Sequence, residues 1–362
     1  SKKHIAEHSK WDRRGFLKTL GIAGAGAVSL GNSSLSVLNS NFLTNALTGS
    51  ISDRSLVLIR LKGGNDGLNT IVPLNQFDTY VNKRPKIHIP QSNLIKLSDD
   101  YAIPDFMNSI EKLWKDGSMK VVNGVGYENP NGSHFKSSDI WASATDNKDI
   151  STGWLGRYYD EKYLDYLTNP PEKPVAIQIG SRGNLIFNGD KTSYAFAVSS
   201  PERLKKVAEN GTLFDTNNLP ECTHGDQVEF LRRISNATFN YASVIQEAYS
   251  ESEAYSKYDS DNDLDTQLSL VSRLIKGNLG SKIYMVSLGG FDTHGNQPER
   301  HQKLLTTLSN SIKVFYDDLK YYGLDKKVLS LTFSEFGRRV AENGSEGTDH
   351  GTAAPVMLFG PA

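Results

Sequence analysis

The chain has 362 residues, of which 38% are hydrophobic and 22% are charged, a composition typical of a soluble globular protein. Its mean hydropathy of -0.44 excludes a bundle of membrane spans, and its formal net charge of -1 gives no electrostatic reason to expect a nucleic acid as partner. Cys222 is the only cysteine, so an internal disulfide and a cysteine-rich metal site are both excluded. A bound metal would need histidine and carboxylate ligands.

The first 52 residues differ in composition from the rest. Arg13 and Arg14 precede Gly-Phe-Leu-Lys and a weakly apolar run, rich in glycine and alanine, over residues 19–30. This pattern resembles a twin-arginine export signal, which we place at residues 1–31. The alternative, an amphipathic surface helix, is disfavoured because each glycine of the run costs about 1 kcal/mol relative to alanine. The resemblance implies transport by the twin-arginine translocase to the periplasm or cell surface.

Residues 32–52 are rich in Asn, Ser and Thr and are expected to form a linker. Beyond them, short apolar runs alternate with segments of helical periodicity, which predicts an α/β fold over residues 53–362: a doubly wound, mostly parallel sheet with helices on both faces. The expected strands are 56–61, 121–125, 176–179, 283–288, 328–333 and 355–359, and the expected helices begin near 104, 227, 268 and 299. Residues 145–263 carry less strand signal and are expected to form an inserted, mostly helical cap.

Unusual polar motifs follow four of the expected strands. They occupy residues 62–69, 129–135, 289–295 and 334–339, and ligands bind at this carboxyl edge in open α/β sheets. A fifth motif, at 348–351, instead precedes the last strand. If that strand runs antiparallel to the others, all five motifs meet in one crevice.

The residue types in these motifs are those of a metal centre. Carboxylates and imidazoles suit one or two divalent ions from among zinc, magnesium, manganese and calcium. The candidate ligands are Asp66, Asp292, His294, Glu335, Asp349 and His350, with His301 in reserve. Any one of them alone is more often an ordinary turn or loop residue than a metal ligand, so the prediction depends on their convergence.

Ser133 is the candidate nucleophile. It follows a strand and begins a helical pattern, which places it at a helix N-terminus, where unpaired N–H groups and the helix dipole favour an anion. The position alone is equally that of an ordinary capping serine. His134 is a general acid, a ligand or a packing residue, and Arg338 is a candidate bidentate clamp for a tetrahedral anion.

The motifs Gly-Gly-Asn-Asp-Gly-Leu-Asn (63–69), Ser-His-Phe (133–135), Gly-Gly-Phe-Asp-Thr-His (289–294), Ser-Glu-Phe-Gly-Arg (334–338) and Gly-Thr-Asp-His-Gly (347–351) resemble those of the exported bacterial family called domain of unknown function 1501. That family is similar to the alkaline phosphatase and sulfatase superfamily. The resemblance implies metal ligation by Asp66, Asp292, His294 or His301, Glu335 and His350, with Ser133 as nucleophile. The sequence departs from the superfamily pattern in two places. It has a Ser-Glu-Phe segment where the superfamily usually has Asp-His, and it lacks the sulfatase Cys/Ser-x-Pro-x-Arg motif around Ser133.

The resulting hypothesis is an exported, metal-dependent hydrolase or transferase that acts on a phosphate or sulfate ester, small or polymeric, through a serine nucleophile. The alternative is a catalytically inactive scaffold or binding protein of the same fold, with a partner in the cell envelope. A nucleotide-binding protein is disfavoured, since residues 62–67 match neither common phosphate-binding glycine pattern. The chain stops just after a strand, so a C-terminal part is expected to be missing.

Overall fold

The computed structural model describes residues 54–147, 149–180, 183–210, 213–214 and 223–361, together with two short strands at 27–30 and 33–36. The chain divides into one unit of residues Ser1–Asp53 with Ala362 and a second unit of residues Arg54–Pro361. In the first unit, β1 (Ala27–Leu30) pairs antiparallel with β2 (Ser33–Ser36). The twin arginines at 13 and 14 and most of the expected linker lie outside the described residues.

The second unit is built on one central sheet, which has seven strands in the part of the chain that the structure describes. In spatial order the strands are β7 (Met119–Val125), β12 (Ala354–Phe359), β11 (Val328–Phe333), β3 (Ser55–Leu61), β10 (Ile283–Leu288), β8 (Ala176–Ile179) and β9 (Ala195–Val198). Only β12 runs antiparallel to its two neighbours; the other pairings are parallel. The predicted α/β fold is therefore confirmed, and the last strand has the antiparallel direction on which the convergence of the five motifs depends.

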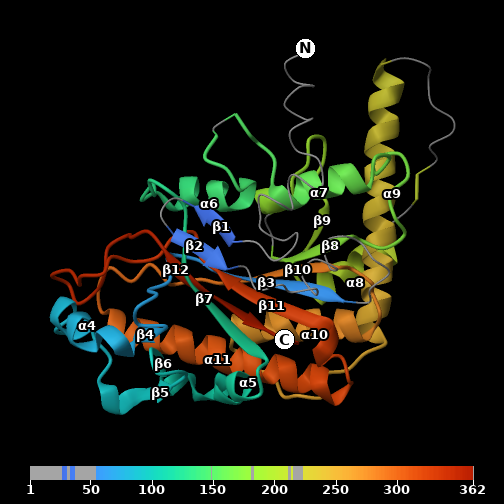
Figure 1. The fold of residues 1–362 in the computed structure, drawn as a ribbon. Helices are drawn as coiled ribbons and strands as arrows, with labels where there is room; N and C mark the ends of the chain where they lie inside the picture. The colour runs from blue at the N-terminus through green and yellow to red at the C-terminus, as the bar shows by residue number, and fades with distance from the viewer. Residues whose placement is uncertain are drawn as a thin grey trace. The chain divides into compact units, whose positions relative to one another are not determined.

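Helices cover both faces of this sheet. The α-helices are α4 (Phe77–Lys83), α5 (Glu111–Lys115), α6 (His134–Ser143), α7 (Trp154–Lys162), α8 (Pro201–Asn210), α9 (Thr223–Ser250), α10 (Asp263–Lys276) and α11 (Gln297–Tyr321). Figure 1 shows α6 and α7 on one face and α10 and α11 on the other. The central strands β3 and β10 are almost entirely buried, as expected for parallel strands covered on both sides.

Short 3-10 helices and a small second sheet complete the unit. The 3-10 helices are η1 (Leu74–Gln76), η2 (Gln91–Asn93), η3 (Asp105–Ile110), η4 (Leu185–Phe187) and η5 (Asp325–Lys327), and the small sheet has the order β4 (Val72–Pro73), β6 (Tyr101–Pro104), β5 (Leu94–Lys96). The helix expected from residue 104 consists of η3 and α5 in succession.

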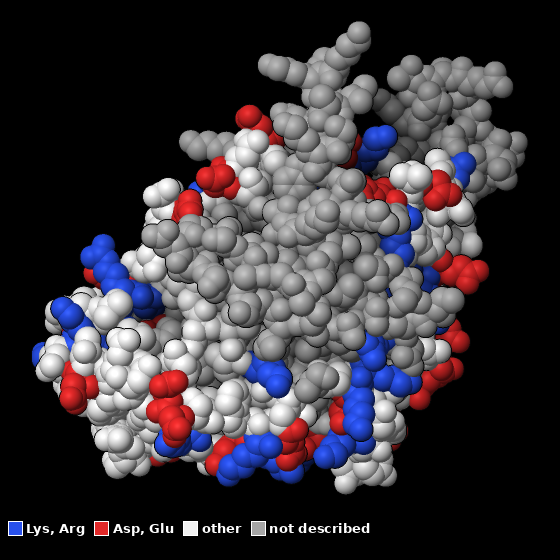
Figure 2. Space-filling view, viewed as in Figure 1, with Lys and Arg blue, Asp and Glu red and all other residues white. Residues whose placement is uncertain are grey.

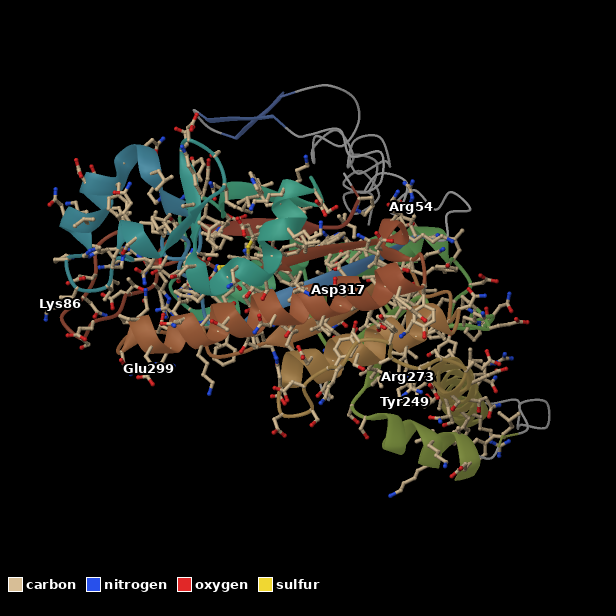
Figure 3. All side chains as sticks on the ribbon, turned by 90° about the horizontal axis from the view of Figure 1, so that it is seen from below. Arg54, Lys86, Tyr249, Arg273, Glu299 and Asp317 are labelled. Atoms are coloured by element: carbon tan, nitrogen blue, oxygen red, sulfur yellow. The ribbon has the colours of Figure 1, made fainter. Side chains whose placement is uncertain are left out.

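The segment 145–263, expected as a mostly helical cap, is more mixed than the sequence indicates. It contains α7, α8 and α9, but β8 and β9 belong to the central sheet. Where α9 packs against α10, the Arg273 guanidinium lies 3.4 Å from the centroid of the Tyr249 ring and donates to its carbonyl oxygen (Figure 3).

The surface shows no segregation of charge over the part in view. Described lysine and arginine side chains are interspersed with aspartate and glutamate side chains in Figure 2. Among the described residues, no helix combines the length and the apolar character that crossing a bilayer requires.

Candidate metal centre

The five polar motifs meet at one edge of the sheet. Four of them follow β3, β7, β10 and β11 at their carboxyl ends, and the fifth enters β12, whose reversed direction brings it to the same edge. A β-bridge between Arg338 and His350 joins the fourth motif to the fifth. The geometric convergence that the sequence predicted is therefore present.

Glycine allows the first and third motifs to touch. Gly63 has φ of +122°, and a Cβ atom there would lie 2.3 Å from the backbone nitrogen of Asp292. Its own N–H donates to Glu335 Oε1 at 2.9 Å. A side chain at residue 63 would therefore push apart the backbone that carries the candidate ligands.

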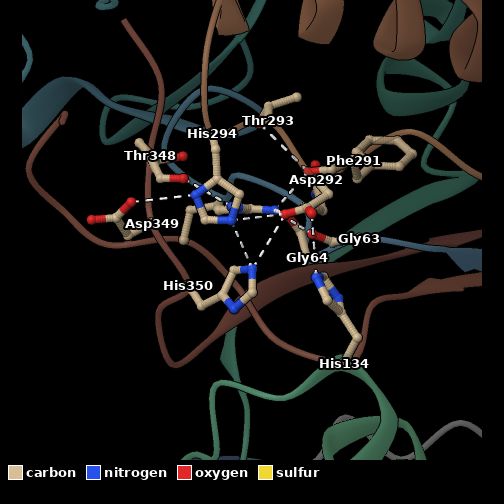
Figure 4. Close-up of polar contacts among 12 residues, drawn as sticks. Gly63, Gly64, His134, Phe291, Asp292, Thr293, His294, Thr348, Asp349 and His350 are labelled. Atoms are coloured by element: carbon tan, nitrogen blue, oxygen red, sulfur yellow. Dashed lines mark hydrogen bonds and ion pairs between the residues drawn. The ribbon is translucent and has the colours of Figure 1, made fainter. Parts of the chain in front are cut away.

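Three donor atoms form a compact triangle at this edge (Figure 4). Asp292 Oδ1 lies 3.1 Å from His294 Nε2 and 3.2 Å from His350 Nε2, and the two imidazole nitrogens are 3.0 Å apart. We call these three atoms the donor triangle. His134 adjoins it, with Nε2 3.5 Å from Asp292 Oδ2, and atoms of His134, Asp292 and His350 lie within 4.8 Å of one another, close enough to hold one metal ion.

The outer nitrogen of each histidine is held by an acceptor. The acceptors of Nδ1 are Glu335 Oε1 for His134 (2.9 Å), Asp349 Oδ1 for His294 (3.3 Å) and the carbonyl oxygen of Gly132 for His350 (2.6 Å). A carboxylate or carbonyl oxygen only accepts, so these three contacts favour the proton on Nδ1. The same rule applies to Asp292 Oδ1, which faces Nε2 of His294 and of His350. Those Nε2 atoms therefore bind a metal only in the state in which they carry no proton, which is the usual state of metal-binding histidines.

These donors fit a divalent cation. Tetrahedral zinc, with bonds of about 2.0–2.2 Å, would place its ligands about 3.3 Å apart, close to the sides of the donor triangle. Without a cation, the Nε2 lone pairs of His294 and His350 face each other at 3.0 Å and repel unless a proton lies between them. His134 Nε2 is positioned either to complete the ligand set or to face a substrate.

Arg338 lies behind the donor triangle and is fully engaged by protein atoms. Its guanidinium donates to Asp292 Oδ1 (2.5 Å) and to the carbonyl oxygens of Gly63, Gly64, Phe291 and Thr348. It therefore fixes the loops of the site and is not placed as the substrate clamp expected from the sequence. Burial alone would raise the pKa of Asp292, but hydrogen bonds from Arg338 and His350 outweigh it and hold this pKa at about 2.

Glu335 and Asp349 contact histidines of the site and take no part in the donor triangle. Glu335 is 3% exposed and holds His134. Asp349 accepts from Asn343 Nδ2 at 3.2 Å as well as from His294, and these hydrogen bonds lower the pKa of Asp349. Both carboxylates act on the candidate ligands from outside and so occupy different positions from those expected of ligands.

Asp66 lies in a buried polar network away from the donor triangle. It is 1% exposed, and its Oδ2 accepts from Arg84 at 2.6 Å and from Gln297. Burial tends to raise the pKa of Asp66, but the Arg84 guanidinium outweighs this and lowers it. The structure therefore does not bring Asp66, one of the expected ligands, into contact with the donor triangle.

His301, the reserve ligand, also lies in this buried network. It is 2% exposed on α11, with Nε2 3.0 Å from Asn65 Oδ1. Burial lowers the pKa of His301 to about 4, so its ring is neutral near pH 7. The structure places it among buried polar side chains and not against the donor triangle.

Ser133 is the N-cap residue of α6, as the sequence predicted. Its hydroxyl is exposed, and the N–H of Lys136 lies 3.5 Å from Oγ, a long contact that leaves the hydroxyl weakly engaged. Its two chain neighbours both touch the site, Gly132 through His350 and His134 through Asp292. The serine therefore lies beside the donor triangle.

Two polar residues of the site region were missed by sequence reasoning. Arg84, between a helix and a proline, gives no local sign of being fully buried against Asp66. Asn343 does carry a local sequence signal, since Asn-Gly marks a turn. In the structure its side-chain amide also donates to the carbonyl oxygen of His294 at 3.0 Å.

The fold and this site together define an α/β protein with a candidate metal centre at the carboxyl edge of its sheet. Residues 117–362 match the family described as "Protein of unknown function (DUF1501)", and because the match spans more than half of the chain, the chain belongs to this family.

No curated protein matches significantly. Among solved structures, a mutant of TAB5 alkaline phosphatase with Mg bound matches at 10% identity with a TM-score of 0.34, over 86% of this chain and 92% of that one. That likeness is too low to support conclusions about the site.

Proposed function

We propose that this protein is a metal-dependent hydrolase or transferase for a phosphate or sulfate ester, with Ser133 as nucleophile. The observation that carries the proposal is the donor triangle of Asp292, His294 and His350 beside an exposed serine at a helix N-terminus. A divalent ion held there would supply Lewis-acid stabilisation of charge on the ester oxygens.

The residues around the serine suit an anionic tetrahedral group. The first backbone N–H groups of α6 have no intrahelical partners and, with the helix dipole, favour a phosphate or sulfate. Ser133 Oγ would bond to phosphorus or sulfur while the bond to the leaving alcohol breaks and that oxygen takes up the hydroxyl proton. Water would then release the group and restore the hydroxyl.

The experiment compares wild type with Ser133→Ala on aryl phosphate monoesters, diesters and aryl sulfates, after loading with zinc, manganese, magnesium or calcium. Wild type should turn over at least one of these esters. Ser133→Ala should be at least about a hundredfold slower, because the nucleophile is removed. Ser109→Ala, a partly exposed serine outside the site, is the control. Full activity of Ser133→Ala would refute the nucleophile, and an inert, metal-bound wild type would favour the scaffold alternative.

We also propose that the protein is exported in the folded state. The support is the Arg13-Arg14 pair before a short, glycine-rich apolar run, since twin-arginine signals are addresses read by a translocase and not membrane spans.

A further inference from the structure

A small cavity lies against Glu335. Its volume, about 10 Å³ for the centre of a water-sized sphere, is close to the least that one water molecule requires. It is lined by Arg60, Ser138, Trp141, Ala142, Asn184, Ile186, Phe333 and Glu335. These residues come from the end of β3, from α6, from η4 and its start, and from the end of β11.

One polar atom of this cavity lacks a partner. Glu335 is 3% exposed, and its Oε2 makes no hydrogen bond to any described residue. The other carboxylate oxygen, Oε1, accepts from the N–H of Gly63 and from His134 Nδ1 at 2.9 Å each. A buried carboxylate oxygen without a hydrogen-bond donor is destabilising, so Glu335 Oε2 calls for a donor.

Arg60 supplies the complementary group. Its Nη2 donates to Ser138 Oγ at 2.6 Å, and the Ser138 hydroxyl in turn donates to the carbonyl oxygen of His134. No described carboxylate forms an ion pair with Arg60, so the remaining N–H groups of its half-buried guanidinium have donating capacity left. The cavity therefore offers an acceptor at Glu335 and donors at Arg60.

The charges around the cavity select the chemistry of its occupant. A cation would be repelled by Arg60, and an anion by Glu335. A neutral hydroxyl both donates and accepts, so it satisfies both groups at once. The apolar walls formed by Trp141, Ile186 and Phe333 leave room for little more than one oxygen atom.

We propose that this cavity binds a single hydroxyl group, which donates to Glu335 Oε2 and accepts from Arg60. The group comes either from one water molecule or from the alcohol part of the ester; the second source rests on the proposed function, and the first does not. In either case Arg60 is a positioning residue, because the hydroxyl fixes the carboxylate that orients His134.

Crystallography of the wild-type protein tests the site directly. In a buffer free of glycerol and ester, an oxygen peak within hydrogen-bond distance of both Glu335 Oε2 and Arg60 identifies water as the source. If no peak is present, Ser133→Ala crystals soaked with glycerol 1-phosphate should show a hydroxyl there, and crystals soaked with propyl phosphate should not. A site without oxygen in all three structures overturns the proposal.

A double-mutant cycle on unfolding temperature tests the bridge without any turnover. Arg60→Met combined with Glu335→Gln should be non-additive, because either change removes one side of the same bridge. Lys62→Met combined with Glu335→Gln is the matched control, since Lys62 interacts with Glu335 through charge alone and does not line the cavity.

Stronger coupling in the Arg60 cycle than in the Lys62 cycle supports the bridging hydroxyl. Equal coupling in the two cycles, or additivity in both, overturns it. Since neither the crystals nor the cycles require hydrolysis, a failure of the proposed function appears separately, as absence of turnover.

Discussion

Loss of Arg84 should destabilise the protein severely. Arg84 is fully buried and makes four hydrogen bonds: to Asp66 Oδ2 (2.6 Å), Asn69 Oδ1 (2.7 Å) and the carbonyl oxygens of Val340 (2.8 Å) and Arg339 (2.9 Å). Arg84→Met keeps much of the volume but leaves the Asp66 carboxylate buried without a countercharge.

Breaking a buried ion pair from one side costs roughly 3–5 kcal/mol. At about 2–4 °C per kcal/mol for a large domain, the midpoint of thermal unfolding at pH 7 should fall by roughly 6–20 °C. The assay is urea and thermal unfolding monitored by circular dichroism. The double variant Asp66→Asn with Arg84→Met should recover part of the loss, because it removes the uncompensated charge.

This account would be refuted if Arg84→Met lost less than about 1 kcal/mol of the free energy of unfolding. It would also be refuted if the loss in the double variant equalled the sum of the losses in the two single variants. The first result would mean that Asp66 is not held as a buried carboxylate by Arg84. The second would mean that the two side chains act independently.

Three further predictions concern the metal, the pH and export. His294→Ala should lower affinity for zinc more than tenfold, measured by elemental analysis after dialysis, whereas Asp66→Asn should retain it; equal metal content in both would contradict the donor triangle. His301 has a pKa of about 4 in the folded protein, below its usual 6.5, so the unfolded state binds more protons than the folded state between these pH values. The contribution of His301 to the free energy of unfolding is therefore fully present above pH 6.5 and should fall by roughly 3 kcal/mol as the pH drops to 4. If the free energy of unfolding of His301→Gln, measured by chemical denaturation, depended on pH as steeply as that of wild type, His301 would not be the origin of this pH dependence. Replacing Arg13 and Arg14 with lysine should retain the protein in the cytoplasm on cell fractionation, and undiminished export would count against the signal.

Buried strands were the most predictable part of the fold. The six expected strands lie within one or two residues of their observed ends, as in 328–333 and 283–288. Five of them are interior strands, which form continuous apolar runs because they are covered on both faces. The sixth, β7, is a partly exposed edge strand. β9, with the sequence Ala-Phe-Ala-Val, was missed because it is a four-residue edge strand. A short run of this kind has no periodicity that separates it from a loop.

The candidate site was predictable as a location but not in the division of its roles. Motifs at strand ends indicated the edge where His294 and His350 meet. Nothing in the sequence shows that Asp66 pairs with an arginine 18 residues away, or that Glu335 holds a histidine. Such roles depend on which side chain lies beside a carboxylate in the folded structure, and the local sequence does not determine this.

The engagement of Arg338 also bears on how the site edge comes apart. One guanidinium joins the carbonyl oxygens of Gly63 and Gly64, of Phe291 and of Thr348, which belong to three loops far apart along the chain. Displacement of this one side chain would break the hydrogen bonds of all three loops together. Amide protons of the three loops should therefore exchange with solvent at a common rate, as one cooperative unit, and the geometry of the donor triangle persists or is lost as a whole.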